Sequence, residues 1–134
     1  MGTKCLIDSN VIIGYLDNKL PKKGMELVDI IMDDIPTVSV ITKIEVLRFN
    51  TPDDSYKILQ NFINDCVVLE LNKLIVDKTI EIGKAHKIKL PDAIIAATAL
   101  VNDLALITRN ISDFKNIKDL ELLNPWAEDN GNPL

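Results

Sequence analysis

The sequence has little of the chemistry that disulfides, zinc sites and thiol or serine catalysis require. It holds two cysteines and one histidine in 134 residues. His86 has no second histidine or cysteine near it, which argues against a zinc site and against a Cys–His or Ser–His catalytic pair. We therefore interpret His86 as a surface residue. Cys5 and Cys66 border apolar runs, so we expect both to be buried as small hydrophobic residues.

The sequence also lacks a secretory signal and a long apolar run. The almost uncharged segment 93–107, interrupted by Asp103, is too short for a membrane helix, which needs about 20 apolar residues. Two cysteines and no signal give no indication of an oxidising compartment. We expect a cytoplasmic protein with no membrane association.

Positive charge is in deficit as well. The formal net charge is −5 at neutral pH, the wrong sign for a protein that holds nucleic acid by neutralising many phosphates. A nucleic-acid substrate would require local contacts, a metal ion or a second subunit. There is also no glycine-rich phosphate-binding loop and no internal repeat.

What the sequence does contain is an alternation of short apolar segments with helical patterns. Segments 4–7, 37–40, 67–71, 104–108 and 120–123 are typical of buried strands, and amphipathic or apolar helical patterns separate most of them. This alternation predicts an α/β fold with a parallel sheet. The length suits one domain, which we expect over residues 1–126, followed by a polar, frayed tail over 127–134.

Polar side chains follow three of these predicted strands. Asp8 comes directly after the first, Glu45 lies in the helix after the second, and Asn110 and Asp113 follow the fourth. A carboxylate at the end of a buried strand is unfavourable without a partner or a metal ion. Because the carboxyl ends of parallel strands lie along one edge of a sheet, we expect these side chains to converge there.

Each acid also has a structural explanation. Ser9 or Asn10 can cap the first helix, and residues 42–45 (TKIE) match a capping box in which Glu45 would bond back to the helix start. Asp92 follows Pro91 at the start of the apolar helix, where a carboxylate is favourable. If residues 87–90 carry Asp92 back to the same edge, four carboxylates meet, and a hard cation such as Mg²⁺ or Mn²⁺ would relieve their repulsion.

Four segments together resemble the PIN domain family, and within it the VapC-type toxins of toxin–antitoxin pairs. The segments are 6–10 (LIDSN), 41–45 (ITKIE), 90–97 (LPDAIIAA) and 108–114 (TRNISDF). The resemblance implies a three-layer α/β/α fold around a mostly parallel twisted sheet of four or five strands. It also implies an Mg²⁺- or Mn²⁺-dependent ribonuclease whose acidic, metal-holding quartet is Asp8, Glu45, Asp92 and Asp113. Asn10 matches a position that orients a carboxylate or a water, and Asn110 stands where some members have an acid.

The resemblance further implies hydrolysis of RNA, a cognate VapB-type antitoxin and a homodimer. Two alternatives remain open at this point: a housekeeping PIN-domain nuclease without an antitoxin, and a non-catalytic binding module whose acids only cap helices. A haloacid-dehalogenase-like phosphatase would use Asp8 as a nucleophile. It is disfavoured because Asn10 stands where that chemistry requires a second acid, and because no lysine motif follows.

Overall fold

The computed structural model describes residues 4–127, which form a five-stranded sheet whose strands are all parallel. The strands are β1 (Cys5–Ile7), β2 (Thr37–Ser39), β3 (Val67–Leu69), β4 (Ala105–Ile107) and β5 (Leu122–Leu123). Their order across the sheet is β3-β2-β1-β4-β5. The predicted parallel α/β sheet is therefore confirmed, with the larger of the two expected strand numbers.

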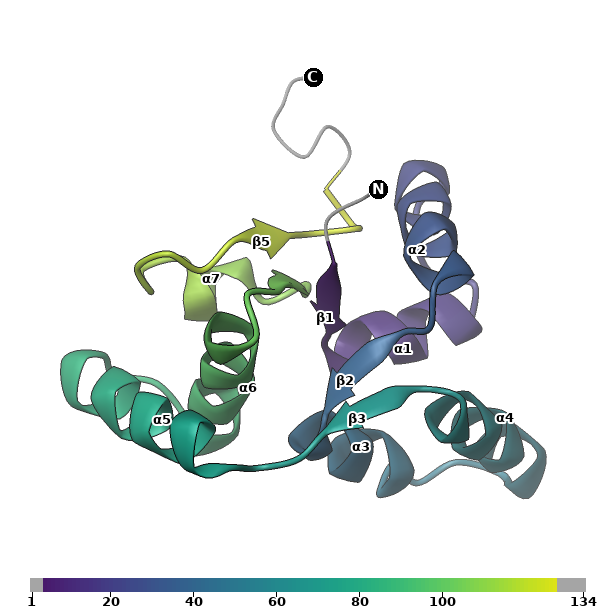
Figure 1. Ribbon diagram of the computed structural model, residues 1–134. Helices are drawn as coiled ribbons and strands as arrows, with labels where there is room; N and C mark the ends of the chain where they lie inside the picture. The colour runs from purple at the N-terminus through teal and green to yellow at the C-terminus, as the bar shows by residue number, and fades with distance from the viewer. Residues whose placement is uncertain (1–3, 128–134) are drawn as a thin grey trace.

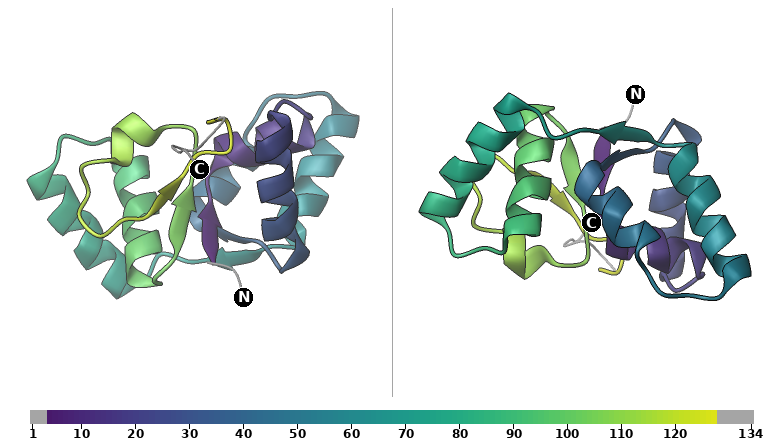
Figure 2. Two further views of the ribbon diagram at one scale, coloured as in Figure 1. Left: turned by 90° about the horizontal axis from the view of Figure 1, so that it is seen from above. Right: turned by 90° about the horizontal axis from the view of Figure 1, so that it is seen from below.

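Helices cover both faces of the sheet and complete three layers (Figure 1). They are α1 (Ser9–Leu16), α2 (Lys22–Asp33), α3 (Val40–Leu47), α4 (Asp53–Asn64), α5 (Lys73–Ala85), α6 (Leu90–Val101) and α7 (Ile111–Phe114). Side chains of α1 to α4 form one core against the sheet, and side chains of α5, α6 and α7 form the other. The two views in Figure 2 show the same division, with α5 and α6 on the side away from α1 and α2.

The division into two cores follows from the alternation of side chains along the strands. Cys5 and Ile7 of β1 enter the core beneath α1, whereas Leu6 between them enters the core beneath α6. Successive side chains of a strand point to opposite faces, so a strand covered on both faces is apolar throughout. Helix α6 is buried from Ala93 to Ala99 because it lies between the sheet and α5.

The strand order creates a switch point beside β1. From β1 the chain builds β2 and then β3 on one side, and later returns to place β4 and β5 on the other. Ile7 of β1 pairs with Ile107 of β4, so residues 8 and 108 leave the sheet side by side. In open parallel sheets, ligands bind outside the strand carboxyl ends at such a reversal of strand order.

Two local expectations differ from the structure or lie outside it. The polar segment 109–114 directly follows β4 and is predicted from its composition to be a loop, but residues 111–114 form the short helix α7. The expected frayed tail over 127–134 lies outside the described residues, apart from Ala127, whose N–H donates to the Asn124 carbonyl (3.2 Å). Within 4–127, none of the helices has the length and apolar character needed to cross a membrane.

The two cysteines lie in apolar surroundings, as expected. Cys5 is buried in the core beneath α1, and Cys66 packs partly buried against the same core. Burial raises the pKa of each thiol to about 11, which keeps both protonated near neutral pH. A thiolate is the reactive form of cysteine, so neither residue has the properties of a nucleophile.

Candidate active site

Asp8 lies at the carboxyl end of β1 with only 4% of its surface exposed. One carboxylate oxygen, Oδ1, accepts a hydrogen bond from the Ser9 backbone N–H (2.8 Å). The other, Oδ2, accepts from the hydroxyl of Thr108 (2.7 Å) and from the amide of Asn10 (3.4 Å). Burial raises the pKa of Asp8 despite these donors. Because its side chain accepts from the Ser9 N–H, Asp8 is itself the N-terminal cap of α1. The expectation that Ser9 or Asn10 caps this helix was wrong.

Glu45 does not form the expected capping box. Helix α3 begins at Val40 and is capped by Ser39, whose hydroxyl accepts from the Ile41 N–H (3.0 Å). Glu45 lies in the second turn, where its Oε1 accepts from the Ser9 hydroxyl (3.0 Å). Burial raises the pKa of Glu45, and the negative charges of two other acids, one of them Asp8, raise it further. Glu45 thus lies with Asp8 at the edge of the sheet.

Asp92 reaches the same place from the start of α6. Pro91 occupies the first turn of that helix, as predicted, and no side chain caps it by a hydrogen bond. Burial raises the pKa of Asp92, as do the negative charges of Asp8 and Asp113, whereas the ammonium of Lys89 opposes the rise. The connection between α5 and α6 therefore does return Asp92 to the edge where β1 and β4 end.

Asp113 and Asn110 lie on the outer side of this group. Both side chains are exposed, on and just before the short helix α7. The charge of Asp113 acts on Asp92, so Asp113 belongs electrostatically to the acidic cluster, defined here as Asp8, Glu45, Asp92 and Asp113. Asn110 is linked to the cluster through its backbone, because its N–H donates to the Thr108 hydroxyl (3.1 Å).

Two hydroxyl residues of the site were not predicted from the sequence to support the acids. Thr108 is fully buried and donates to Asp8, and Ser9 donates to Glu45. Thr108 had a readable signal, because it is the polar residue that ends a buried strand, as Asp8 is. Ser9 had none beyond its place next to Asp8. Both hydroxyls hold a carboxylate in position, and neither carries charge.

The donor set of the cluster suits a hard divalent cation. The cluster offers carboxylate oxygens alone, and mutual repulsion disfavours their joint ionisation, which a bound cation would offset. Among residues 4–127, no three His, Cys, Asp or Glu side chains are arranged to hold a metal ion together. Mg²⁺ does not require such a cage, because proteins usually bind it through one or two carboxylates together with waters and substrate phosphates.

Two cavities flank the acidic cluster. One, of about 610 Å³, is lined by residues that include Lys87, Lys89, Asp92 and Asp113. His86, half-buried, also lines it. The other, of about 620 Å³, lies beside α1; it is lined by Asn10, Ile13, Gly14, Asp17, Lys19, Arg109 and Trp126. Open space therefore adjoins Asp92 and Asp113 in one cavity and Asn10, which donates to Asp8, in the other.

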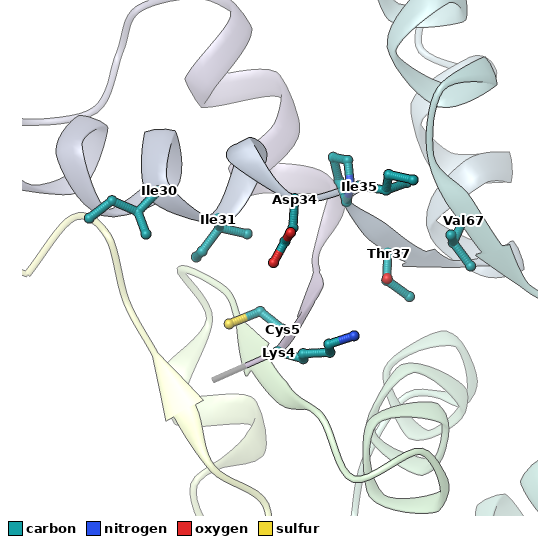
Figure 3. Close-up of a pocket in the computed structure, with 9 residues that line it drawn as sticks. Lys4, Cys5, Ile30, Ile31, Asp34, Ile35, Thr37 and Val67 are labelled. Atoms are coloured by element: carbon teal, nitrogen blue, oxygen red, sulfur yellow. The ribbon is translucent and has the colours of Figure 1, made fainter. Parts of the chain in front are cut away.

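A third cavity lies at the opposite edge of the sheet and is shown in Figure 3. It measures about 380 Å³ and lies where β1, β2 and β3 begin, between Lys4, Asp34 and Thr37. It contains none of the clustered acids. Because chemistry in parallel α/β sheets gathers at the carboxyl ends of the strands, this cavity is not the candidate active site.

Comparison with known structures gives the same fold. A chain of a toxin–antitoxin complex from Klebsiella pneumoniae is 25% identical, with a TM-score of 0.73 over 92% of this chain and 98% of that one. A chain of VapBC-1 from nontypeable Haemophilus influenzae is also 25% identical, with a TM-score of 0.72 over 90% of this chain and 96% of that one. A chain of DNA-bound VapBC from Salmonella typhimurium is 22% identical, with a TM-score of 0.76 over 94% of this chain and 100% of that one.

No curated protein matches the chain in sequence. A family model described as the PIN domain, in contrast, matches residues 5–120, a range that contains all four members of the acidic cluster. The resemblance to VapC-type PIN domains that the sequence motifs predicted is thereby confirmed. The chain belongs to the PIN domain family.

Proposed function

We propose that this protein is an endoribonuclease that hydrolyses RNA phosphodiester bonds with the help of Mg²⁺ or Mn²⁺. The observation that carries the proposal is the acidic cluster at the switch point of the sheet. Burial raises the pKa of Asp8, Glu45 and Asp92, and the negative charges of neighbouring acids raise the pKa of Glu45 and of Asp92 further. Such repulsion at one point is unfavourable for folding and useful for holding a cation.

The chain's own residues divide the work as follows. Asp8 and Asp92 would hold the metal, with Glu45 and Asp113 contributing directly or through water. Thr108 and Asn10 fix the orientation of the Asp8 carboxylate, and neither adds negative charge. A divalent cation bound there supplies an activated water for attack on phosphorus and neutralises charge that builds on the phosphate oxygens.

The acids are not explained as helix caps alone. Asp8 does cap α1, but Glu45 lies in the second turn of α3, and Asp92 makes no capping hydrogen bond. Capping by hydrogen bonds therefore does not account for the positions of Glu45 and Asp92. The structure therefore supports the nuclease over the module whose acids only cap helices.

We further propose that the protein is the toxin of a pair with a VapB-type antitoxin, that it forms a homodimer, and that residues 1–126 make up its PIN domain. Support comes from its structural neighbours, which include a toxin–antitoxin complex and VapBC proteins that it matches over nearly their whole length. A housekeeping PIN nuclease with the same fold would lack such a partner. Co-expression with a short gene adjacent to this one, followed by co-purification, separates the two.

The direct test is expression of the wild type and of Asp8→Asn in a bacterium, with mapping of new RNA 5′ ends. We expect new 5′-phosphate ends and slowed growth with the wild type, and neither with Asp8→Asn. In vitro, purified wild type should cleave single-stranded RNA with Mn²⁺ or Mg²⁺ and stop on addition of a chelator. Identical RNA profiles for the two proteins would remove the nuclease proposal.

Asp103→Asn is the matched control for this experiment. Asp103 is exposed in the turn after α6 and so lies at the opposite end of the helix that carries Asp92. It has a positive φ of 56°, a conformation that asparagine tolerates well. The substitution removes the same charge without touching the cluster, so cleavage should be unchanged.

A further inference from the structure

Two helical glycines provide the seat for the last described segment of the chain. A Cβ on Gly24 of α2 would lie 1.8 Å from the carbonyl oxygen of Pro125, and a Cβ on Gly14 of α1 would lie 2.7 Å from Cζ2 of Trp126. The chain leaving β5 crosses toward α2 in Figure 1. The Asn124 side chain accepts from the Trp126 N–H (2.9 Å). The indole is therefore held against α1 by close backbone packing.

The seated indole in turn holds the side chain of Arg109. The guanidinium carbon of Arg109 lies 4.7 Å from the centre of the Trp126 ring, a cation–π contact. The Arg109 backbone is fixed as well, because its N–H donates to Oδ1 of Asn10 (3.1 Å), whose amide reaches Asp8. One end of Arg109 is thus tied to the acidic cluster and the other to Trp126.

Arg109 keeps its charge available in this position. Within residues 4–127 its guanidinium takes part in no salt bridge and no side-chain hydrogen bond, and the residue is exposed. The cavity of about 620 Å³ that it lines begins at Asn10, next to the cluster, and also contains Lys19 and one acid, Asp17. A planar guanidinium with unused donors suits a phosphate, which it can bind through two parallel hydrogen bonds.

We propose that Arg109 binds a phosphate of the RNA strand next to the scissile bond, and that Trp126 is a positioning residue that holds Arg109 for this contact. The inference rests on the proposed ribonuclease function. It also answers a difficulty set by the net charge of −5: RNA approaching an acidic cluster needs a local cation that the acids do not neutralise. A stacked arginine loses little side-chain freedom on binding, so the contact is preorganised.

The test measures binding of a short, labelled, mixed-sequence single-stranded RNA by anisotropy in the Asp8→Asn background, where no cleavage occurs. We expect Arg109→Ala to weaken binding about tenfold, as for a hydrogen-bonded charge. The fall of the log of the binding constant with the log of the salt concentration should also become less steep by about 0.7, the value for one phosphate contact on a single strand. Arg109→Lys should keep the slope and lose part of the affinity.

Lys57→Ala is the matched control. Lys57 is exposed on α4 and lines none of the three cavities, so its loss should change neither affinity nor slope. Trp126 is the only tryptophan of the chain, and its fluorescence gives a second readout. Saturating unlabelled RNA should change the emission of the Asp8→Asn protein and leave it unchanged once Arg109 is replaced.

A double-mutant cycle separates positioning from general stability. If Trp126 acts through Arg109, Trp126→Phe should keep most of the RNA affinity, and Trp126→Ala should lose the part that Arg109 contributes. Once Arg109 is alanine, Trp126→Ala should have no further effect on binding. A purely structural tryptophan would instead weaken binding equally in both backgrounds. That outcome, or unchanged binding by Arg109→Ala, overturns the inference.

These outcomes are distinguishable from failure of the proposed function. If the wild type cleaves RNA and Asp8→Asn does not, while Arg109→Ala binds RNA as tightly as its parent, the nuclease stands and the inference falls. If the wild type neither cleaves nor binds RNA, both fall. Thermal melts of every variant verify that each protein is folded at the assay temperature.

Discussion

At the scale of single residues, Thr108 is a neutral side chain that supports the site through two hydrogen bonds. Its hydroxyl donates to Asp8 (2.7 Å) and accepts from the Asn110 N–H (3.1 Å), in a fully buried position. Thr108→Val keeps the shape and removes both hydrogen bonds, leaving a buried carboxylate with one donor fewer. We expect a loss of about 1–3 kcal/mol in the free energy of unfolding, measured by urea denaturation at neutral pH.

Thr108→Ser is the control for that substitution, because it keeps the hydroxyl and deletes only a methyl group. It should cost less than Thr108→Val. Equal losses from the two substitutions would mean that packing of the methyl group, rather than support of Asp8, is what Thr108 contributes.

The same residue shows where the sequence was informative and where it was not. The burial of Asp8 was predictable, because Asp8 directly follows a strand that is apolar throughout and so is covered on both faces. Its partner Thr108 lies a hundred positions away, and it becomes a partner only through the pairing of β1 with β4. Local sequence patterns do not give the register between distant strands. The position of Thr108 at the end of a buried strand was therefore readable from the sequence, but its pairing with Asp8 was not.

At the scale of elements, the start of α3 shows how a local pattern can mislead. Residues 42–45 match a capping box, yet β2 ends one residue earlier than expected and Ser39 caps the helix instead. Thr42 then falls inside α3, fully buried, and its Oγ1 has no hydrogen-bond partner within the described chain. Because the pattern failed, the structural explanation of Glu45 failed with it, which favours its role in the cluster.

A pair of substitutions tests this assignment of the helix start. Ser39→Ala removes the cap of α3 and should lower the free energy of unfolding by about 1 kcal/mol. Thr42→Val replaces an unsatisfied buried hydroxyl with a methyl group and should be neutral or stabilising. Urea denaturation measures the free energy of unfolding of both variants. If Thr42→Val destabilised the protein and Ser39→Ala did not, Thr42 would be the cap.

The glycines of the helices provide a second test at this scale. Glycine inside a helix is less favourable than alanine by about 1 kcal/mol, so Gly83→Ala in α5, with no atom within 4 Å of the new Cβ, should stabilise the protein by that amount. Gly24→Ala should destabilise it by about 1–3 kcal/mol, because Pro125 occupies the space. Thermal melts compare the two, and equal shifts would mean that the segment after β5 is not seated on α2.

At the scale of the whole molecule, the fold brings acids from four separate segments to one edge of the sheet. The alternation of strands and helices and the convergence of strand ends could be predicted, because they follow from layer packing and connection handedness. The return of Asp92 to the edge could be stated only as a condition, since it depends on how α6 packs between α5 and the sheet. That packing involves contacts between segments far apart in the sequence, so local sequence patterns do not predict it.

Bringing these acids together makes stability depend on pH in a definite direction. Burial raises the pKa of Asp8, Glu45 and Asp92, so each binds its proton more tightly in the folded protein. Such a group stabilises fully below the unfolded pKa, about 4, and that stability is lost as pH rises through the higher folded pKa. We expect the urea midpoint of the metal-free protein to fall from pH 4.5 toward neutrality. Asp8→Asn should flatten the decline and be the more stable protein at neutral pH.

A divalent cation should reverse this decline, because it binds the ionised cluster of the folded protein and finds no such cluster in the unfolded chain. At a concentration one hundred times its Kd, Mn²⁺ adds about 2.7 kcal/mol to the free energy of unfolding. The increment should be largest at neutral pH and shrink toward pH 4.5, where protons compete for the same oxygens. Asp8→Asn and Asp92→Asn should lose it, whereas Asp103→Asn should retain it. Melting curves with and without Mn²⁺ that coincide for the wild type would mean that the repelling carboxylates serve no metal at all.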